Sequence, residues 1–125
     1  CLIMPRVKIK PGVEFAVIKP AGMRILEAIK ATCRSVQVDL TITSGTDGTH
    51  SGPLDPHKTG EAYDLRSKGL PAGMPAQVGS SSALFLGPAF YVFLEGAGSP
   101  NEHIHAQRKK GTAYSILDYL AAGML

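Results

Sequence analysis

The sequence predicts one small domain that mixes α-helices with β-strands. Apolar residues recur at helical spacing between residues 20 and 34, whereas apolar and polar residues alternate between residues 36 and 43. Two further strand-like segments, residues 90–94 and 103–107, are separated by a turn rich in glycine and proline. The length of 125 residues fits a single domain, residues 1–125, with a core of its own.

The first half of the chain is expected to hold strands around one helix. Residues 6–10 and 14–18 are strand-like and are split by Pro11-Gly12, and the first alternates as an edge strand does. Lys19-Pro20 opens a helix that runs to about Arg34, with an apolar face made of Met23, Leu26, Ile29 and Cys33. The alternating strand of residues 36–43 then leads into a polar loop, residues 44–53, of the kind that borders active sites.

The second half is expected to add a hairpin and two helices. A turn at 56–60 precedes a short strand at 62–66, on which Ala62, Asp64 and Arg66 share one face. Proline and glycine predict a loop at 68–79, followed by a short helix at 80–86. A buried strand at 90–94 pairs with 103–107, and Thr112 caps a final helix whose inward residues are Tyr114, Leu117, Leu120 and Met124.

The net charge, the apolar runs and the cysteine count make some classes of function less favoured. The net charge is only +3, and the basic residues are scattered apart from Arg108-Lys109-Lys110, so a nucleic-acid binder is the least favoured class. There is no signal-peptide pattern and no apolar run that could span a bilayer, so we expect a soluble protein without membrane insertion. The two cysteines allow one disulfide at most, and Cys33 is expected to be buried in its helix.

Two short motifs carry the chemistry, His57 to Asp64 and Glu102 to His105. A catalytic zinc site takes three ligands from histidine and carboxylate side chains and keeps a position open for water. His57, Asp64 and His105 meet this need, and Gly60 lets the chain fold back between the first two. His103 lies on the same strand face as His105 and is expected to line the pocket, while a carboxylate such as Glu102 accepts the proton.

Plainer interpretations exist for each of these residues. A single histidine near a strand end is usually a surface residue or a satisfied core residue, and Asp64 is also compatible with a turn or an ion pair to Arg66. A site of histidine and aspartate without cysteine also suits divalent metals other than zinc.

The pattern His57-x-x-Gly60-x-Ala62-x-Asp64, followed by Glu102-x-x-His105, resembles the D-Ala-D-Ala carboxypeptidase/dipeptidase family of zinc peptidases, in particular its small phage endolysin-like members. The resemblance spans roughly residues 20–107 and implies an α+β fold, a small antiparallel sheet with helices packed on it. It implies that His57, Asp64 and His105 bind zinc and that Glu102 is the general base. It also implies peptidoglycan stem peptides as substrates, cut at bonds involving D-amino acids by a carboxypeptidase or endopeptidase, and a location at the cell wall, in the periplasm or with a phage.

The sequence departs from that family at the residue expected to stabilise the oxyanion. Many members carry an arginine in the loop where Thr46 and Asp47 stand here, so the positive charge must come from His50, Arg66 or His103, of which we favour His50. Asp55 replaces a common serine two residues before the first ligand, and Glu95 is a rival for the base. The alternative function is a non-catalytic zinc-containing binding module of the same fold, and in either case we expect a monomer.

Overall fold

The computed structural model describes residues 4–48, 52 and 54–124, and it has an α+β fold. One mixed sheet has the strand order β1-β2-β3-β5-β4, with β1 Val7–Ile9, β2 Leu40–Ser44, β3 Ala62–Arg66, β4 Phe90–Glu95 and β5 His103–Arg108. The helices are α1 Pro20–Val36, α2 Pro56–Thr59, α3 Met74–Leu86 and α4 Ile116–Ala121. Among the described residues, no helix combines the length and the apolarity needed to cross a membrane.

The sheet is mixed, so the expectation of a wholly antiparallel sheet is wrong at one edge. β2, β3, β5 and β4 pair antiparallel in that order, whereas β1 pairs parallel with β2 through Val7 and Leu40. The reason is the connection, because α1 lies between β1 and β2 in the chain and carries it back to the end where β1 began. The expectation that residues 6–10 form an edge strand is confirmed by β1.

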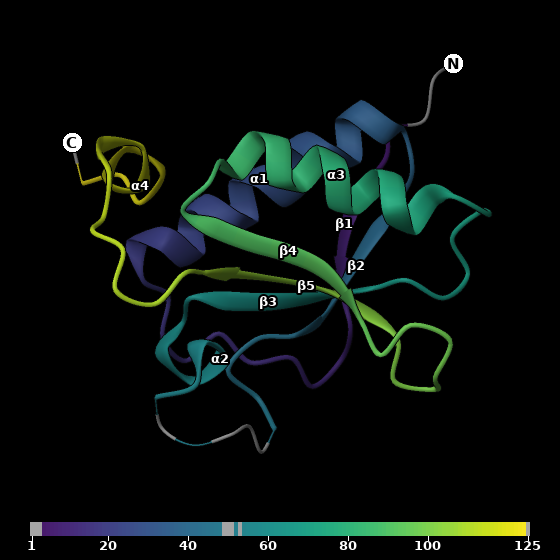
Figure 1. The fold of residues 1–125 in the computed structure, drawn as a ribbon, viewed down its shortest axis with the longest axis horizontal. Helices are drawn as coiled ribbons and strands as arrows, with labels where there is room; N and C mark the ends of the chain where they lie inside the picture. Colours follow the sequence, from purple (N-terminus) through teal and green to yellow (C-terminus); the bar gives the residue numbers. More distant parts are fainter. Residues whose placement is uncertain (1–3, 49–51, 53, 125) are drawn as a thin grey trace.

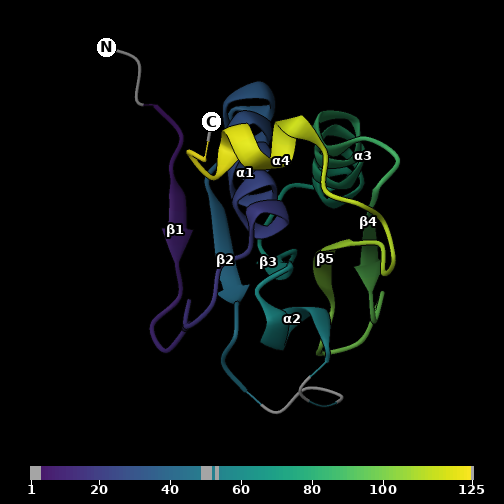
Figure 2. The same ribbon diagram turned by 90° about the vertical axis from the view of Figure 1, so that its left-hand side faces the viewer.

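Helices α1 and α3 cover one face of the sheet, as Figures 1 and 2 show. The residues of α1 that face the core are Ala21, Ile25, Ala28, Ile29 and Cys33, whereas Met23 and Leu26 are only partly buried. These helix residues form one apolar cluster with alternate residues of the strands, namely Tyr63 and Leu65 of β3 and Ile104 of β5. The side chains between them, Asp64 and His105, therefore point to the opposite face.

Three expected elements of the first half of the chain differ in the structure. Residues 14–18 form no strand, because Ala16 donates its amide to Thr46 Oγ1 and Glu14 accepts from the Thr46 amide, which docks the segment on a loop. The strand expected from residue 36 starts at Leu40, because α1 continues to Val36 and Gln37 ends it in the left-handed region. The turn at 56–60 is a single turn of helix, α2.

The second half differs in its helices and in its edge strand. Helix α3 begins at Met74, within the predicted loop, because proline is tolerated in the first turn of a helix and Pro75 stands there. Strand β4 is an edge strand, so only Phe90 is buried along it, and the expectation of a buried strand is wrong. Ser115, not Thr112, precedes α4, and Thr112 instead donates to the Lys109 carbonyl.

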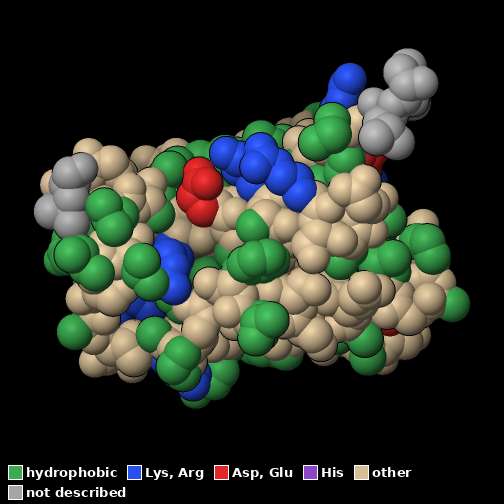
Figure 3. All heavy atoms as spheres, turned by 90° about the horizontal axis from the view of Figure 1, so that it is seen from above, with side chains coloured by type: hydrophobic (Ala, Val, Ile, Leu, Met, Phe, Trp, Pro, Cys, Tyr) green, Lys and Arg blue, Asp and Glu red, His purple; other side chains and the backbone are tan. Residues whose placement is uncertain are grey.

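Helix α4 is short, and its expected inward residues are mostly exposed: Leu117 and Leu120 are each 52% exposed and Met124 is 61% exposed. Arg24 holds the helix in place, pairing with Asp118 at 3.1 Å and donating to the Leu86 carbonyl at 2.8 Å. Only Tyr114, just before the helix, packs against the core. Figure 3 looks onto the helical side and shows apolar and basic side chains but no histidine among the described residues.

Candidate metal centre

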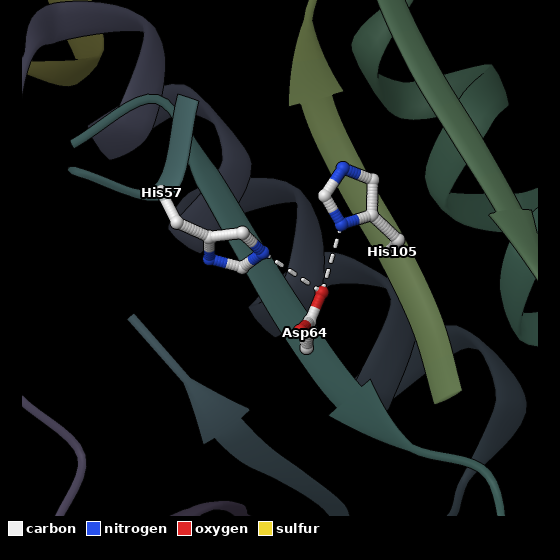
Figure 4. Close-up of side chains that lie close together, drawn as sticks. All are labelled: His57, Asp64 and His105. Atoms are coloured by element: carbon white, nitrogen blue, oxygen red, sulfur yellow. Dashed lines mark hydrogen bonds and ion pairs between the residues drawn. The ribbon is translucent and has the colours of Figure 1, made fainter. Parts of the chain in front are cut away.

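Two histidines and one aspartate converge at the face of the sheet opposite α1 and α3 (Figure 4). Asp64 of β3 and His105 of β5 are register partners, and His57 comes from α2. Asp64 Oδ1 lies 2.8 Å from His105 Nδ1 and 3.2 Å from His57 Nε2. His57 and His105 are only 4% and 6% exposed and Asp64 is 9% exposed, so the group is largely shielded from water. The structure therefore brings together the three residues that the sequence predicts as ligands.

Helix α2 is too short to hold its shape alone, and hydrogen bonds at both ends fix it. The Asp55 carboxylate accepts from the His57 amide at 2.9 Å, which makes Asp55 the N-cap at the position where the resembling family often has serine. Lys58 donates to the Thr46 carbonyl at 2.8 Å. Gly60 ends the helix with φ +81°, so the expected role of this glycine in folding the chain back is confirmed.

The outward nitrogen of each ligand histidine is held by an acceptor. His57 Nδ1 lies 3.0 Å from the Gly45 carbonyl oxygen, and His105 Nε2 lies 2.7 Å from Gln107 Oε1. Because both partners are acceptors, each of these nitrogens carries a proton and donates it. The inward nitrogens, His57 Nε2 and His105 Nδ1, then turn lone pairs toward Asp64 when the imidazoles are neutral. In metal sites, acceptors of this kind fix the tautomer and the orientation of the histidine ligands.

The donor set fits a zinc ion. Two neutral imidazole lone pairs beside a carboxylate oxygen repel one another unless a cation or a proton lies between them. Ligand atoms of a tetrahedral zinc site with bonds of 2.0–2.1 Å are about 3.3 Å apart, close to the 3.2 Å between His57 Nε2 and Asp64 Oδ1. The pair of Asp64 and His105 at 2.8 Å is closer and would have to separate by about half an ångström.

The electrostatics of the group favour an ionised Asp64. Burial disfavours the charged form of Asp64, but the contacts with His105 and His57 outweigh it and hold the pKa of the carboxyl well below its usual value. Burial likewise lowers the pKa of His105, and the contacts with Asp64 and Gln107 outweigh it and leave that pKa raised. Asp64 is therefore anionic at neutral pH, as a metal ligand must be.

His103 and Glu95 extend the group along the sheet. His103 Nε2 lies 3.6 Å from Asp64 Oδ2 and 3.8 Å from Glu95 Oε1, and Glu95 Oε2 lies 3.8 Å from His105 Nδ1. The Asn101 carbonyl accepts from His103 Nδ1 at 2.6 Å, which leaves Nε2 directed toward the carboxylates. His103 lines the site as the sequence predicts, and Ile104 between the two histidines is buried in the core.

Two other predicted site residues are not placed among the ligands. Both carboxylate oxygens of Glu102 accept hydrogen bonds, from the Ser67 hydroxyl at 2.8 Å and the Gly98 amide at 2.9 Å. These two bonds lower the pKa of Glu102. Two groups among the described residues have ligand atoms that all lie within 4.8 Å of one another, His57-Asp64-His105 and Glu95-His103-His105, and Glu102 belongs to neither. His50, proposed for the oxyanion, lies outside the described residues.

The sequence does not predict that Gln107 and Gly45 hold the ligand histidines, nor that Glu95 lies beside them. The hairpin was predicted, but its register was not, and the register decides that Glu95 pairs with His103 and Phe93 with His105. Alternation along the predicted strand would place Glu95 and Phe93 on one face, which is the only signal the sequence offers for them. Gly45 acts through its backbone carbonyl, which leaves no mark in the sequence.

No known protein-family model, curated protein or solved structure matches this chain. The family that the two motifs resemble therefore stays a prediction from residues.

Proposed function

We propose that this chain is a zinc-dependent peptidase that hydrolyses peptide bonds in peptidoglycan stem peptides. The observation that carries the zinc site is the convergence of His57 Nε2, Asp64 Oδ1 and His105 Nδ1, with the outer nitrogen of each imidazole already donating to an acceptor. The substrate class rests on the two motifs that resemble the D-Ala-D-Ala carboxypeptidase/dipeptidase family. The proposal includes action on the cell wall, as a periplasmic or phage-associated enzyme.

In the proposed reaction the C–N bond of a peptide breaks, water gives its hydroxyl to the carbonyl carbon, and the leaving nitrogen gains a proton. When bound, zinc supplies a Lewis acid that polarises the carbonyl and makes hydroxide available near neutral pH. A carboxylate of the chain must accept the proton of water and pass it to the leaving amine. The resemblance gives this role to Glu102, whereas the distances favour Glu95, whose Oε2 lies 3.8 Å from His105 Nδ1.

His103 is the described histidine best situated to face charge that develops at the carbonyl oxygen. Its Nε2 is directed toward the carboxylates of Asp64 and Glu95, and its Nδ1 is held by the Asn101 carbonyl. A fixed imidazole of this kind acts as a preorganised donor when it is protonated. Phe93 packs beside His105 with ring centroids 5.1 Å apart.

The direct experiment incubates the zinc-loaded protein with purified peptidoglycan and follows the release of new amino termini by mass spectrometry. We expect cleavage by the wild type and by Asp39→Asn, and none by Asp64→Asn. Asp39 is the matched control because it is an exposed aspartate that pairs with Lys8 at 3.1 Å on strand β1, at the edge of the sheet. Equal cleavage by Asp64→Asn would exclude the proposed ligand set.

One observation favours a second candidate, a zinc-containing binding module without activity. The predicted base Glu102 has both oxygens engaged, by the Ser67 hydroxyl and the Gly98 amide, and it belongs to neither group of possible metal ligands among the described residues. Retention of the zinc-loaded protein on insoluble peptidoglycan without any new amino termini would support the module and contradict the peptidase.

A further inference from the structure

A hollow of about 350 Å³ adjoins the candidate metal centre. Asp64 and His103 line it on the side of the metal ligands, and its other walls include Lys10, Arg66, Lys68 and Glu102. The volume lies in the range of pockets that bind small molecules. A group bound here would therefore lie immediately beside the proposed reaction centre.

The cations of this hollow are available to a ligand. Arg66 follows Asp64 by two residues on β3, so the two side chains share a face, and its register partner is His103. Arg66 and Lys10 are both exposed, and neither forms an ion pair with any residue in the described ranges. Lys68 donates to the Pro100 carbonyl at 2.8 Å, which fixes its ammonium group without neutralising it.

The two carboxylates of the hollow do not cancel this charge. Asp64 Oδ1 faces His57 and His105, where a bound zinc ion would neutralise it. Glu102 accepts from Ser67 and Gly98 through both oxygens and therefore has little capacity left to pair with a bound cationic group. Among the described residues that line the hollow, three cations then stand against one remaining carboxylate, which gives it a net positive charge when zinc is bound.

We propose that this basic hollow binds the C-terminal carboxylate of the substrate peptide, so that the enzyme removes the last residue and does not cut internal bonds. Arg66 is the principal contact, because a guanidinium presents paired N–H donors that match the two oxygens of a carboxylate. The terminal carboxylate of the leaving residue lies only one residue beyond the scissile carbonyl. A cationic subsite that shares Asp64 and His103 with the metal centre is therefore at the right place for it. This inference rests on the proposed peptidase function.

The test compares two stem peptides that differ only at the C terminus, one with a free carboxylate and one with a carboxamide. We measure kcat/KM of the zinc-loaded wild type for each by liquid chromatography and mass spectrometry. A charge-assisted pair predicts a preference for the acid of about tenfold or more. Arg66→Gln should reduce this ratio toward one, mainly through KM, and Lys10→Gln should reduce it in part. Arg34→Gln, the same change at an exposed position of α1, should keep the full preference.

The outcomes separate this inference from the proposed function. Equal cleavage of acid and amide, or a preference that survives in both Arg66→Gln and Lys10→Gln, overturns the carboxylate subsite while the peptidase remains. Cleavage that depends on an internal acidic side chain of the peptide, and not on whether the C terminus is an acid or an amide, also overturns it.

Absence of any cleavage contradicts the peptidase, and binding then decides the subsite. The zinc-loaded protein is titrated with the same two peptides and followed by nuclear magnetic resonance of the backbone amides. Binding of the acid about tenfold tighter than the amide, lost in Arg66→Gln and kept in Arg34→Gln, supports the subsite. Equal binding of the two peptides overturns it.

Discussion

At the scale of single residues, the candidate site depends on which nitrogen of each imidazole carries the proton. The Gly45 carbonyl and the Gln107 side chain hold the outer nitrogens of His57 and His105 at 3.0 Å and 2.7 Å. The Gln107 amide is itself oriented, because its nitrogen donates to the Arg108 carbonyl at 3.4 Å. Gln107, which is not one of the candidate ligands, thus decides whether His105 Nδ1 can offer a lone pair to a metal.

Replacement of Gln107 tests this dependence. We expect Gln107→Leu to weaken zinc binding by roughly ten- to hundredfold, because His105 loses the acceptor that fixes its tautomer and ring orientation. Isothermal titration of the metal-free protein with zinc measures the effect. Gln77→Leu, an exposed glutamine on α3, is the control and should bind zinc as the wild type does. Unchanged affinity in Gln107→Leu would show that its bond to His105 is incidental.

The identity of the proton acceptor is a second question at this scale. Glu95 lies 3.8 Å from His105 and His103, whereas Glu102 is bonded to Ser67 and Gly98. We expect Glu95→Gln to reduce kcat by about a hundredfold or more, while zinc stays bound, because general base catalysis contributes that much. Glu102→Gln should retain most of kcat. The reverse pattern would restore Glu102 to the role that the resemblance implies.

At the scale of elements, a four-residue helix supplies one ligand, and a glycine makes its connection to the sheet possible. Gly60 joins α2 to β3 with φ +81°, and a Cβ there would lie 2.3 Å from the Val17 carbonyl oxygen. The segment before α1 therefore passes directly against this turn. The Lys19 amide also donates to the Gly60 carbonyl at 3.3 Å, so the position of His57 depends on this close contact.

Alanine at Gly60 should disturb both stability and the site. We expect Gly60→Ala to lower the free energy of unfolding by more than about 3 kcal/mol, from backbone strain and overpacking together. Gly69→Ala is the matched control, since its φ is +85° with nothing within 4 Å of a Cβ, and should cost about 1–2 kcal/mol. Urea unfolding measures both. Equal losses in the two variants would show that Gly60 is needed for its φ alone.

The sequence predicts the strands that carry the ligands better than the helices around them. The face shared by Asp64 and Arg66 follows from alternation, and the pairing of β4 with β5 follows from the turn between them; the structure confirms both. The sequence predicts only the second half of helix α3. Pro75 indicates a break in a helix unless it is known to lie in the first turn. Register and side-chain partners, such as the bonds of Glu102 to Ser67 and Gly98, depend on tertiary contacts that no local pattern records.

At the scale of the whole molecule, one face of the sheet packs the core and the other carries the candidate site. Its covered face supplies Tyr63, Leu65 and Ile104 to the core under α1 and α3. Its other face carries two rows across β3, β5 and β4, one of Arg66, His103 and Glu95 and one of Asp64, His105 and Phe93. Substitutions in these rows should therefore change binding and activity with little loss of core packing.

Zinc should nonetheless stabilise the whole fold, because its three ligands come from α2, β3 and β5. A ligand that binds only the folded chain adds about 2.7 kcal/mol at a free concentration of one hundred times its Kd. For a domain of this size we expect a rise in Tm of roughly 10 °C, measured by scanning calorimetry and reversed by a chelator. Asp64→Asn should lose the rise, and Glu95→Gln should keep it, because Glu95 is not among the three ligands. A rise that persists in Asp64→Asn would mean that zinc binds elsewhere on the chain.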